Sequence, residues 1–489
     1  MSSSINPTPT GSLTSPTTRP TRRRFLQQMA VTGLVFGSGG VLTSCATAGG
    51  GDDGGDDGAN EGEVSEDNPL GVPAEAPLEV YIFNGGFTDA YATETHQPMY
   101  AETYPDAEID HSATEDIGGE LQSRFVAGDP PDVVNNSGDG QIDPGQLVSS
   151  EQVMDLTELF DAPSWDDPEV PVRDTLLPGT VESGTFGDAP YQLNYAFTVY
   201  GLWYDQALFD EHGWTAPTTW DEMLELCAEI QSAGIAPWTY QGQHPRYMSW
   251  PLLTMAAKLG GSEVITAIDN LEEGAWGHDA VREAAAALAS LNEQGYILEG
   301  TAGMDHVQAQ TAWCEGQAAF VPCGSWLESE QADVIPEGFQ MTFLAEPMLS
   351  ADGAMSPETI RAAPGEPFVV PADANNPQGG LEYLRIMLSQ DGARGFTEQT
   401  SSLTAVAGAA DDVELPPGLA SAQAGLDAAG DDVVNWLYPT WYRSLENPAI
   451  DTMMGDLLTN RISVDEWVEG CEAEAAAVRD DDSVTKYTR

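Results

Sequence analysis

Basic residues are scarce in this chain. Of its 489 residues, 17 are lysine or arginine and 79 are aspartate or glutamate, which gives a formal net charge of −62 at pH 7. Only two of the basic residues are lysines, Lys258 and Lys486. A surface this acidic repels phosphate backbones and anionic lipid headgroups, so we expect no binding to nucleic acid. A saline habitat would also account for such acidity.

The spacings that mark metal sites and several kinds of catalytic site are also missing. The six histidines are scattered, and neither C-x-x-C nor H-E-x-x-H occurs. We therefore expect no metal and no cofactor. No G-x-S-x-G motif and no phosphate-binding loop is present either, which disfavours serine hydrolases and nucleotide-binding enzymes.

Cysteine is sparse, with five in the chain. Cys45 belongs to the export signal described below. Cys314 ends a predicted helix and Cys323 lies toward the far end of the next strand, so their Cα atoms are farther apart than the about 7 Å that a disulfide allows. Cys227 and Cys471 both lie in helical patterns and can pair or stay free.

No run of about 20 apolar residues is present, so no secure membrane span is expected. The N-terminus instead has the pattern of an export signal. Residues 21–26 (TRRRFL) form a twin-arginine pattern, and a short apolar run interrupted by glycine follows over residues 29–42. Residues 42–45 (LTSC) read as a lipobox. We predict that residues 1–44 are a twin-arginine lipoprotein signal peptide and that Cys45 is lipidated.

The next segment, residues 45–70, is rich in glycine and aspartate. Residues 46–67 have no apolar periodicity and lack the ligand spacing of a calcium loop. We interpret residues 45–70 as the lipidated cysteine followed by a flexible acidic tether, which holds the folded body away from the membrane.

The body begins with strands and helices that alternate. They are expected over residues 78–83, 89–104, 107–112, 117–127 and 132–135. This alternation indicates βαβ units and a mostly parallel sheet. Ligands bind such sheets at the carboxyl ends of strands, where this chain has the polar stretches Asn84-Gly85-Gly86 and Asn136-Ser137-Gly138-Asp139.

A second sheet is predicted to begin at residues 191–195. Thr219 has Glu222 three positions later, which predicts a capping box at the start of a helix. The remaining strands are expected over residues 199–204, 318–323 and 368–370, and the remaining helices over 205–212, 280–291, 306–314, 380–388 and much of the C-terminal third.

The strand over residues 318–323 is followed by a tryptophan near its tip. The stretch Ala319–Glu330 reads AFVPCGSWLESE, so Trp326 comes directly after Gly-Ser. A core position is the simple explanation, because large aromatic side chains are mostly buried. A binding role is the alternative.

Four stretches in order resemble the maltose-binding-protein-like superfamily of carbohydrate-binding lipoproteins, which serve ABC importers. They are DPPDVVNNSGDG (129–140), GLWYDQALFDEHGWTAPTTWDEMLELC (201–227), GQAAFVPCGSW (316–326) and GEPFVVPADANNP (365–377). A narrower similarity is to the N-acetylglucosamine/diacetylchitobiose-binding lipoproteins of Gram-positive bacteria. It is carried by stretches such as YQLNYAFTVYGLWY, PWTYQGQHPRYM and FVPCGSWLESE.

The resemblance implies an α/β, two-lobe periplasmic-binding-protein-like fold of type II, with a hinge between the lobes and the ligand in the inter-lobe cleft. It implies lobe one over 71–196 and 348–402, and lobe two over 197–347 and 403–489. The implied function is that of a non-catalytic monomer, anchored at the outer face of the cell membrane, that delivers a carbohydrate to an ABC permease. A secreted glycoside hydrolase acting on amino-sugar oligosaccharides is the alternative, since the same aromatic and acidic residues can serve one.

The resemblance also implies site residues. Trp326 matches the aromatic residue that stacks on a pyranose ring. The other candidate ligand contacts are Asn84, Phe87, Asn136, Asp139, Tyr195, Tyr247, Glu328, Arg361 and Trp441. Several of these residues have a structural alternative. Asn136 and Asp139 can cap a turn, and Glu328, with the neighbouring Glu330, can belong to a solvated helix start. Arg361 can form a surface salt bridge, and Trp441 can pack in the core.

Overall fold

The computed structural model describes residues 62–138 and 140–489. The predicted signal peptide, Cys45, most of the predicted tether and Asp139 lie outside the described residues. Within the described residues, no helix has the length and apolar character needed to cross a bilayer.

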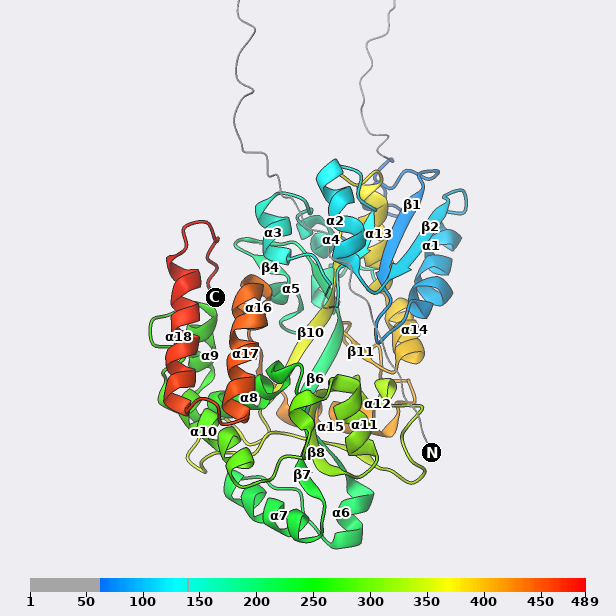
Figure 1. The fold of residues 1–489 in the computed structure, drawn as a ribbon. Helices are drawn as coiled ribbons and strands as arrows, with labels where there is room; N and C mark the ends of the chain where they lie inside the picture. The colour runs from blue at the N-terminus through cyan, green and yellow to red at the C-terminus, as the bar shows by residue number, and fades with distance from the viewer. Residues whose placement is uncertain (1–61, 139) are drawn as a thin grey trace, which may run out of the picture. The chain divides into compact units, whose positions relative to one another are not determined.

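One mixed sheet extends through the body (Figure 1), with strand order β2-β1-β3-β10-β6-β8-β7, while β9 and β11 pair with β6, and β12 pairs with β10. The strands are β1 (Leu78–Phe83), β2 (Ile109–Thr114), β3 (Val133–Asn135), β6 (Leu193–Asp205), β7 (Ala236–Trp238), β8 (Ala318–Gly324), β9 (Met341–Leu344), β10 (Ile360–Val369), β11 (Leu403–Thr404) and β12 (Val433–Val434). The short strands β4 (Thr185–Phe186) and β5 (Ala189–Pro190) form a separate hairpin.

One sequence expectation about the sheet is wrong and another is confirmed for the first strands. No second large sheet begins near residue 191, because β6 is a single strand of 13 residues that joins both halves of the same sheet. The parallel arrangement predicted for the first three strands is confirmed, but it does not extend across the whole sheet. Strand β1 is parallel to β2 and β3, whereas β10 is antiparallel to β3 and to β6, and β6 is antiparallel to β8. Two long strands that cross the molecule in opposite directions produce this mixture.

The α-helices are α1 (Gln97–Thr103), α2 (Ile117–Ala127), α3 (Pro144–Ser149), α4 (Thr157–Asp161), α5 (Thr180–Ser183), α6 (Gln206–His212), α7 (Trp220–Ser232), α8 (Ser249–Gly260), α9 (Ser262–Asp269), α10 (Asp279–Glu293), α11 (His306–Cys314), α12 (Leu327–Glu330), α13 (Pro377–Met387), α14 (Gln390–Thr400), α15 (Pro417–Ala429), α16 (Tyr438–Trp441), α17 (Asp451–Leu458) and α18 (Val464–Asp480). The predicted bounds of α2 and α11 are confirmed, as is the capping box of Thr219 and Glu222 at the start of α7. The helix expected over residues 89–104 is confirmed to within one residue at each end, although its first half includes a π-helical turn over Ala92–His96 that leads into α1.

Two large buried cores divide the body. One core is built from residues 70–196 and 368–409, and we call the part around it lobe one. The other is built mainly from residues 197–487, and we call the part around it lobe two. On the lobe-one sheet, Val80 and Ile82 of β1 face this first core, whereas Tyr81 and Phe83 face a smaller cluster on the opposite side. The chain boundaries of the lobes given above stay a prediction.

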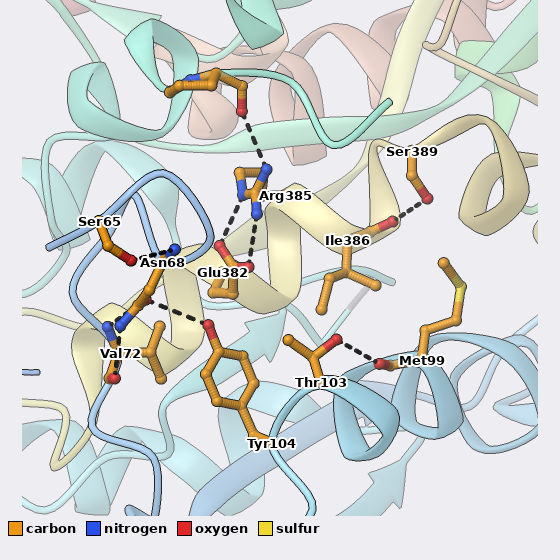
Figure 2. Close-up of polar contacts among 11 residues, drawn as sticks. Ser65, Asn68, Val72, Met99, Thr103, Tyr104, Glu382, Arg385, Ile386 and Ser389 are labelled. Atoms are coloured by element: carbon orange, nitrogen blue, oxygen red, sulfur yellow. Dashed lines mark hydrogen bonds and ion pairs between the residues drawn. The ribbon is translucent and has the colours of Figure 1, made fainter. Parts of the chain in front are cut away.

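Lobe one contains a buried ion pair within α13. The guanidinium of Arg385 donates to both carboxylate oxygens of Glu382, at 2.7 and 2.8 Å, and to the carbonyl of Pro163 at 3.1 Å (Figure 2). This bidentate geometry provides a hydrogen bond to each oxygen of the Glu382 carboxylate, which is fully buried. Nearby, Asn68 accepts from the Val72 amide and donates to its carbonyl, which closes the loop before β1.

All four cysteines of the described residues are free and buried. The expectation that Cys314 and Cys323 do not pair is confirmed, and Cys227 and Cys471 stay unpaired as well. Burial raises the pKa of the Cys227 and Cys314 thiols to about 12, so both are neutral near pH 7 and behave as small apolar side chains.

One of the two lysines is completely buried. Lys258 of α8 donates to the carbonyl of Glu346 at 2.5 Å and to the carbonyl of Pro357 at 2.7 Å, which ties the segment between β9 and β10 to α8. The Lys258 ammonium opposes the effect of burial on Glu346, yet burial still raises the pKa of the Glu346 carboxyl to about 7.

We predict that Lys258→Met destabilises the protein most between pH 7 and pH 8, where Glu346 is ionised and Lys258 is still charged, because burial lowers the pKa of the Lys258 ammonium to about 8. Removing the cation leaves an uncompensated buried carboxylate, which typically costs about 3–5 kcal/mol. The loss should be smaller at pH 5, where the Glu346 carboxyl is protonated. Urea unfolding at about pH 7.5 and pH 5 measures both values. The control is Lys486→Met, because Lys486 is exposed and surface substitutions usually change stability by no more than about 0.5 kcal/mol. Equal losses for the two variants would contradict the prediction.

Candidate functional site

A cavity of about 630 Å³ lies between the ends of the lobe-one strands and lobe two, over the crossing strands β6 and β10. Its volume falls in the range of about 300–1,000 Å³ that is usual for pockets holding small ligands. Three groups of residues line it: loops after the lobe-one strands, the crossing strands themselves, and a lobe-two wall.

The lobe-one wall is formed at the carboxyl ends of β1, β2 and β3, as the sequence predicted. It contains Phe83 to Phe87, Glu115, Gly138 and Gly140. Gly85 and Gly138 lie so close to the ring of Phe83 that there is no room for a Cβ atom at either position. A Cβ atom on Gly85 would lie 2.1 Å from that ring, and one on Gly138, which has a φ of +81°, would lie 2.4 Å from it. The glycine-rich loops therefore let the backbone close tightly around an aromatic side chain.

The floor of the cavity consists of small residues and one strained glutamate. Ala196 and Thr198 of β6 and Gly365 of β10 leave open space above the strands. Glu366 adopts a φ of +56°, in the left-handed region that non-glycine residues rarely occupy. Such strain clusters at functional sites. Burial raises the pKa of the Glu366 carboxyl to about 7, while hydrogen bonds from Ser137 and Asn135 oppose that rise.

The lobe-two wall is aromatic around Trp326, which follows β8 and is half-buried. Its indole lies across Gly324, because a Cβ atom on that glycine would be 2.0 Å from the ring. Tyr200, Tyr247 and Trp250 meet the indole in near-perpendicular contacts, with ring centroids 5.6, 6.4 and 5.9 Å away. These contacts fix the orientation of an aromatic ring that borders the cavity.

The same wall carries polar groups. His306 lies 3.7 Å from the Glu330 carboxylate, whose Oε2 atom is buried and has no hydrogen-bond partner among the described residues. His244 packs against His306 with ring centroids 5.7 Å apart. The backbone amide of Arg246 donates to Asp451 at 2.5 Å, which anchors this segment to the interior of lobe two.

The structure brings four of the sequence-predicted residues together at this cavity. Asn84 and Phe87 lie on the lobe-one wall, and Tyr247 and Trp326 lie on the lobe-two wall. Their contact with a ligand stays a prediction. Asp139 lies outside the described residues.

Five other predicted residues do not line the cavity, and we correct their placement. Tyr195 is buried in the lobe-one core, where its hydroxyl donates to the Met387 carbonyl at 2.8 Å. The amide of Asn136 is used within its own loop, since it donates to the Ile142 carbonyl and accepts from the Ile142 amide.

Two more, Glu328 and Trp441, are held by contacts within lobe two and with the short β4 strand. Glu328 accepts from the backbone amide of Leu419 at 3.0 Å, near the start of α15. The indole of Trp441 donates to the Thr185 carbonyl at 3.2 Å and packs on Tyr487. Arg361 is also absent from this cavity and lines a smaller one beside it.

Several residues of the cavity were missed. They are Phe83, Glu115, Thr198, Tyr200, His244, Arg246, His306, Glu330 and Glu366. The sequence did contain a signal for His244 and Arg246, because both shortly precede Tyr247 in the same stretch. No local signal marks Glu366, whose position depends on the crossing of two strands that are far apart in sequence.

Comparison with known proteins gives consistent matches. Residues 84–394 match the family described as bacterial extracellular solute-binding protein. The chain is 34% identical over 469 residues, 95% of this chain and 97% of the relative, to the diacetylchitobiose binding protein NgcE of Streptomyces coelicolor. It is 28% identical over 181 residues, 36% of this chain and 40% of the relative, to a probable sugar-binding periplasmic protein of Mesorhizobium japonicum.

Solved structures share the fold. The solute-binding protein RafE in complex with raffinose superposes with a TM-score of 0.63 and 18% identity, covering 82% of this chain and 99% of that chain. A chitin oligosaccharide binding protein superposes with a TM-score of 0.60 and 18% identity, covering 79% of this chain and 94% of that chain. At this level of identity, the likeness establishes the two-lobe α/β fold.

We predict that Glu366→Gln changes how stability depends on pH. The pKa of this carboxyl is about 7 in the folded chain and 4.5 ordinarily, so the folded chain binds more protons than the unfolded chain between these values. Stability is therefore lost as the pH rises from 4.5 through 7. Because glutamine stays neutral, the variant should be more stable than the parent at pH 8, by about 1–3 kcal/mol. The difference should vanish near pH 4. Denaturant unfolding across this range measures it, and a difference that is constant with pH would refute the assignment.

Proposed function

We propose, from the premise that the chain belongs to the bacterial extracellular solute-binding protein family, that it is the binding component of an ABC sugar importer. Its ligand is N-acetylglucosamine, the β-1,4-linked dimer diacetylchitobiose, or a related oligosaccharide. The observation that carries the proposal is the 34% identity, over 95% of the chain, to a protein named for diacetylchitobiose binding.

The composition of the cavity supports a sugar ligand. A pyranose ring has an apolar C–H face that can lie against the indole of Trp326, whereas its hydroxyl groups project sideways. Buried hydroxyls need hydrogen-bond partners, because leaving one unpaired costs about 1–3 kcal/mol. Glu330 on the lobe-two wall and Glu366 on the floor offer carboxylate acceptors, and Thr198 offers a hydroxyl.

The crossing strands provide a route for closure. Strands β6 and β10 pass from one lobe to the other side by side, and residues at such connections can absorb the rotation of a hinge. A ligand that touches both walls favours the closed form, because it binds that form more tightly. The closed, ligand-loaded monomer is the form delivered to the membrane permease, and lipidated Cys45 keeps it at the outer face of the membrane.

A glycoside hydrolase is the competing function, since Glu115, Glu330 and Glu366 line one cavity. Hydrolysis requires two carboxyl groups placed about 5–9.5 Å apart across the scissile bond. The family to which the chain belongs is one of solute-binding proteins, which favours binding without turnover.

We predict that Trp326→Ala lowers sugar affinity at least 10-fold, since the lost stacking should exceed the about 1.4 kcal/mol that corresponds to this factor. The stability loss should stay below the about 3–5 kcal/mol typical of a buried tryptophan, because Trp326 is half-buried. Trp326→Phe should recover part of the affinity. Calorimetric titration with diacetylchitobiose and thermal melting measure the two effects.

The control for this substitution is Trp276→Ala. Trp276 is 1% exposed and packs in the lobe-two core against Tyr438 and Trp467. The Trp276→Ala variant should lose much stability, while the fraction that stays folded should keep the sugar affinity of the parent. If Trp326→Ala melts far earlier but binds sugar as the parent does, Trp326 is a core residue.

We also predict that the protein does not turn over its ligand. Purified protein incubated with diacetylchitobiose should release no N-acetylglucosamine, measured by chromatography over hours. Release that depends on Glu330 or Glu366 would establish the hydrolase instead.

A further inference from the structure

A second cavity lies on the same face of the crossing strands as the first. In the antiparallel pair of β6 and β10, Tyr200 is opposite Arg361, Thr198 is opposite Ala363, and Ala196 is opposite Gly365. Directly opposed residues of an antiparallel pair share one face of the sheet. These six residues therefore form one continuous surface, with its β6 half beneath the first cavity.

The second cavity, of about 220 Å³, lies over the β10 half of that surface. Arg361 and Ala363 line it, and Tyr200 and Gly365 line both cavities. By contrast, Phe197 and Ala362 point to the opposite face and line a third cavity, which shares Pro364 and Asn435 with the second cavity but no residue with the first. The second cavity is smaller than a typical small-ligand pocket of about 300 Å³ or more, so it fits better as an extension of the first than as a separate site.

Arg361 is the central residue of this second chamber. Its side chain is 8% exposed, and its guanidinium lies 3.9 Å from the ring centroid of Tyr200 and 4.1 Å from that of Trp436. The two rings stabilise the positive charge, but Nε and Nη1 have no hydrogen-bond partner among the described residues. A buried guanidinium with unused donors calls for an acceptor from outside the chain.

The rest of the lining matches an acetamido group. Glu446 lines the chamber and is near enough to act electrostatically on Arg361, so it can accept from an amide N–H. Trp436 and Leu437 provide apolar surface for a methyl group. A carboxylate-bearing sugar fits less well, because it would meet the Glu446 carboxylate in an already acidic protein.

We propose that this second chamber binds a second sugar ring through its 2-acetamido group, so that the ligand is at least a disaccharide of N-acetylated sugars. Arg361 donates to the acetamido carbonyl and Glu446 accepts from its N–H, while the first ring stacks on Trp326. This inference rests on the proposed function and adds a subsite and a residue that selects for acetamido sugars.

The test is calorimetric titration of the full-length protein with N-acetylglucosamine, diacetylchitobiose and cellobiose. Cellobiose has the same linkage and ring configuration but no acetamido groups. We expect the parent protein to bind diacetylchitobiose at least 10-fold more tightly than either of the other sugars. Arg361→Met should weaken diacetylchitobiose binding at least 10-fold more than it weakens binding of N-acetylglucosamine or cellobiose.

Two further variants separate recognition from folding. Thr440 is a half-buried residue of α16 that lines the second chamber. Thr440→Phe places a bulky ring in that chamber and should produce the same selective loss of diacetylchitobiose binding. Arg385→Met is the matched control, because Arg385 is also buried and stacks on an aromatic ring, Trp165, but lies in lobe one. It should lower the melting temperature without changing the ratio of the three affinities.

The outcomes are distinguishable. If no sugar binds the parent protein, the proposed function fails. If diacetylchitobiose binds no more tightly than N-acetylglucosamine, or if Arg361→Met and Thr440→Phe weaken all three sugars equally, the proposed function survives and the acetamido subsite is refuted. Should Arg361→Met fail to fold, Thr440→Phe alone decides between these outcomes.

Discussion

Strands β6 and β10 are hydrogen-bonded side by side as they pass from one lobe to the other. Their register determines what each face of the connection presents. One face carries small residues, Tyr200 and Arg361, and borders both chambers of the candidate site. The other face carries Phe197 and Ala362 and borders a third cavity. A shift of register by one residue would exchange these faces, so the position of the binding surface depends on this one pairing.

Tyr200 links the two chambers physically. Its ring contacts the guanidinium of Arg361, and it also contacts the indoles of Trp250 and Trp326. A ligand ring that shifts Trp326 therefore acts on the residue that supports Arg361. Because interiors are closely packed, such a shift is transmitted rather than absorbed. The site depends on a few groups that the fold holds in place, such as the half-buried Glu366 and the buried Arg361.

The sequence by itself determined the local structure. The hydroxyl of Thr219 and the carboxylate of Glu222 satisfy backbone amides within one turn, so the start of α7 could be predicted from two residues. The bounds of α2 and α11 were also predicted correctly. Strand ends followed by glycine placed the lobe-one wall of the cavity, and the Gly-Ser-Trp stretch after β8 indicated Trp326. Each of these depends on interactions between neighbours in the chain.

Only the tertiary structure decided which polar side chains reach the cavity. Asn136 follows β3, and Glu366 lies within β10, the strand that pairs with β3. The Asn136 amide turns inward to Ile142, whereas Glu366 lines the cavity. Tyr195 is drawn into the core by the carbonyl of Met387, which is 192 positions away. The sequence shows that a polar residue stands near a strand end. Its direction is set by hydrogen bonds and packing with residues that only folding brings within reach, because a buried polar group must find a partner wherever the chain provides one.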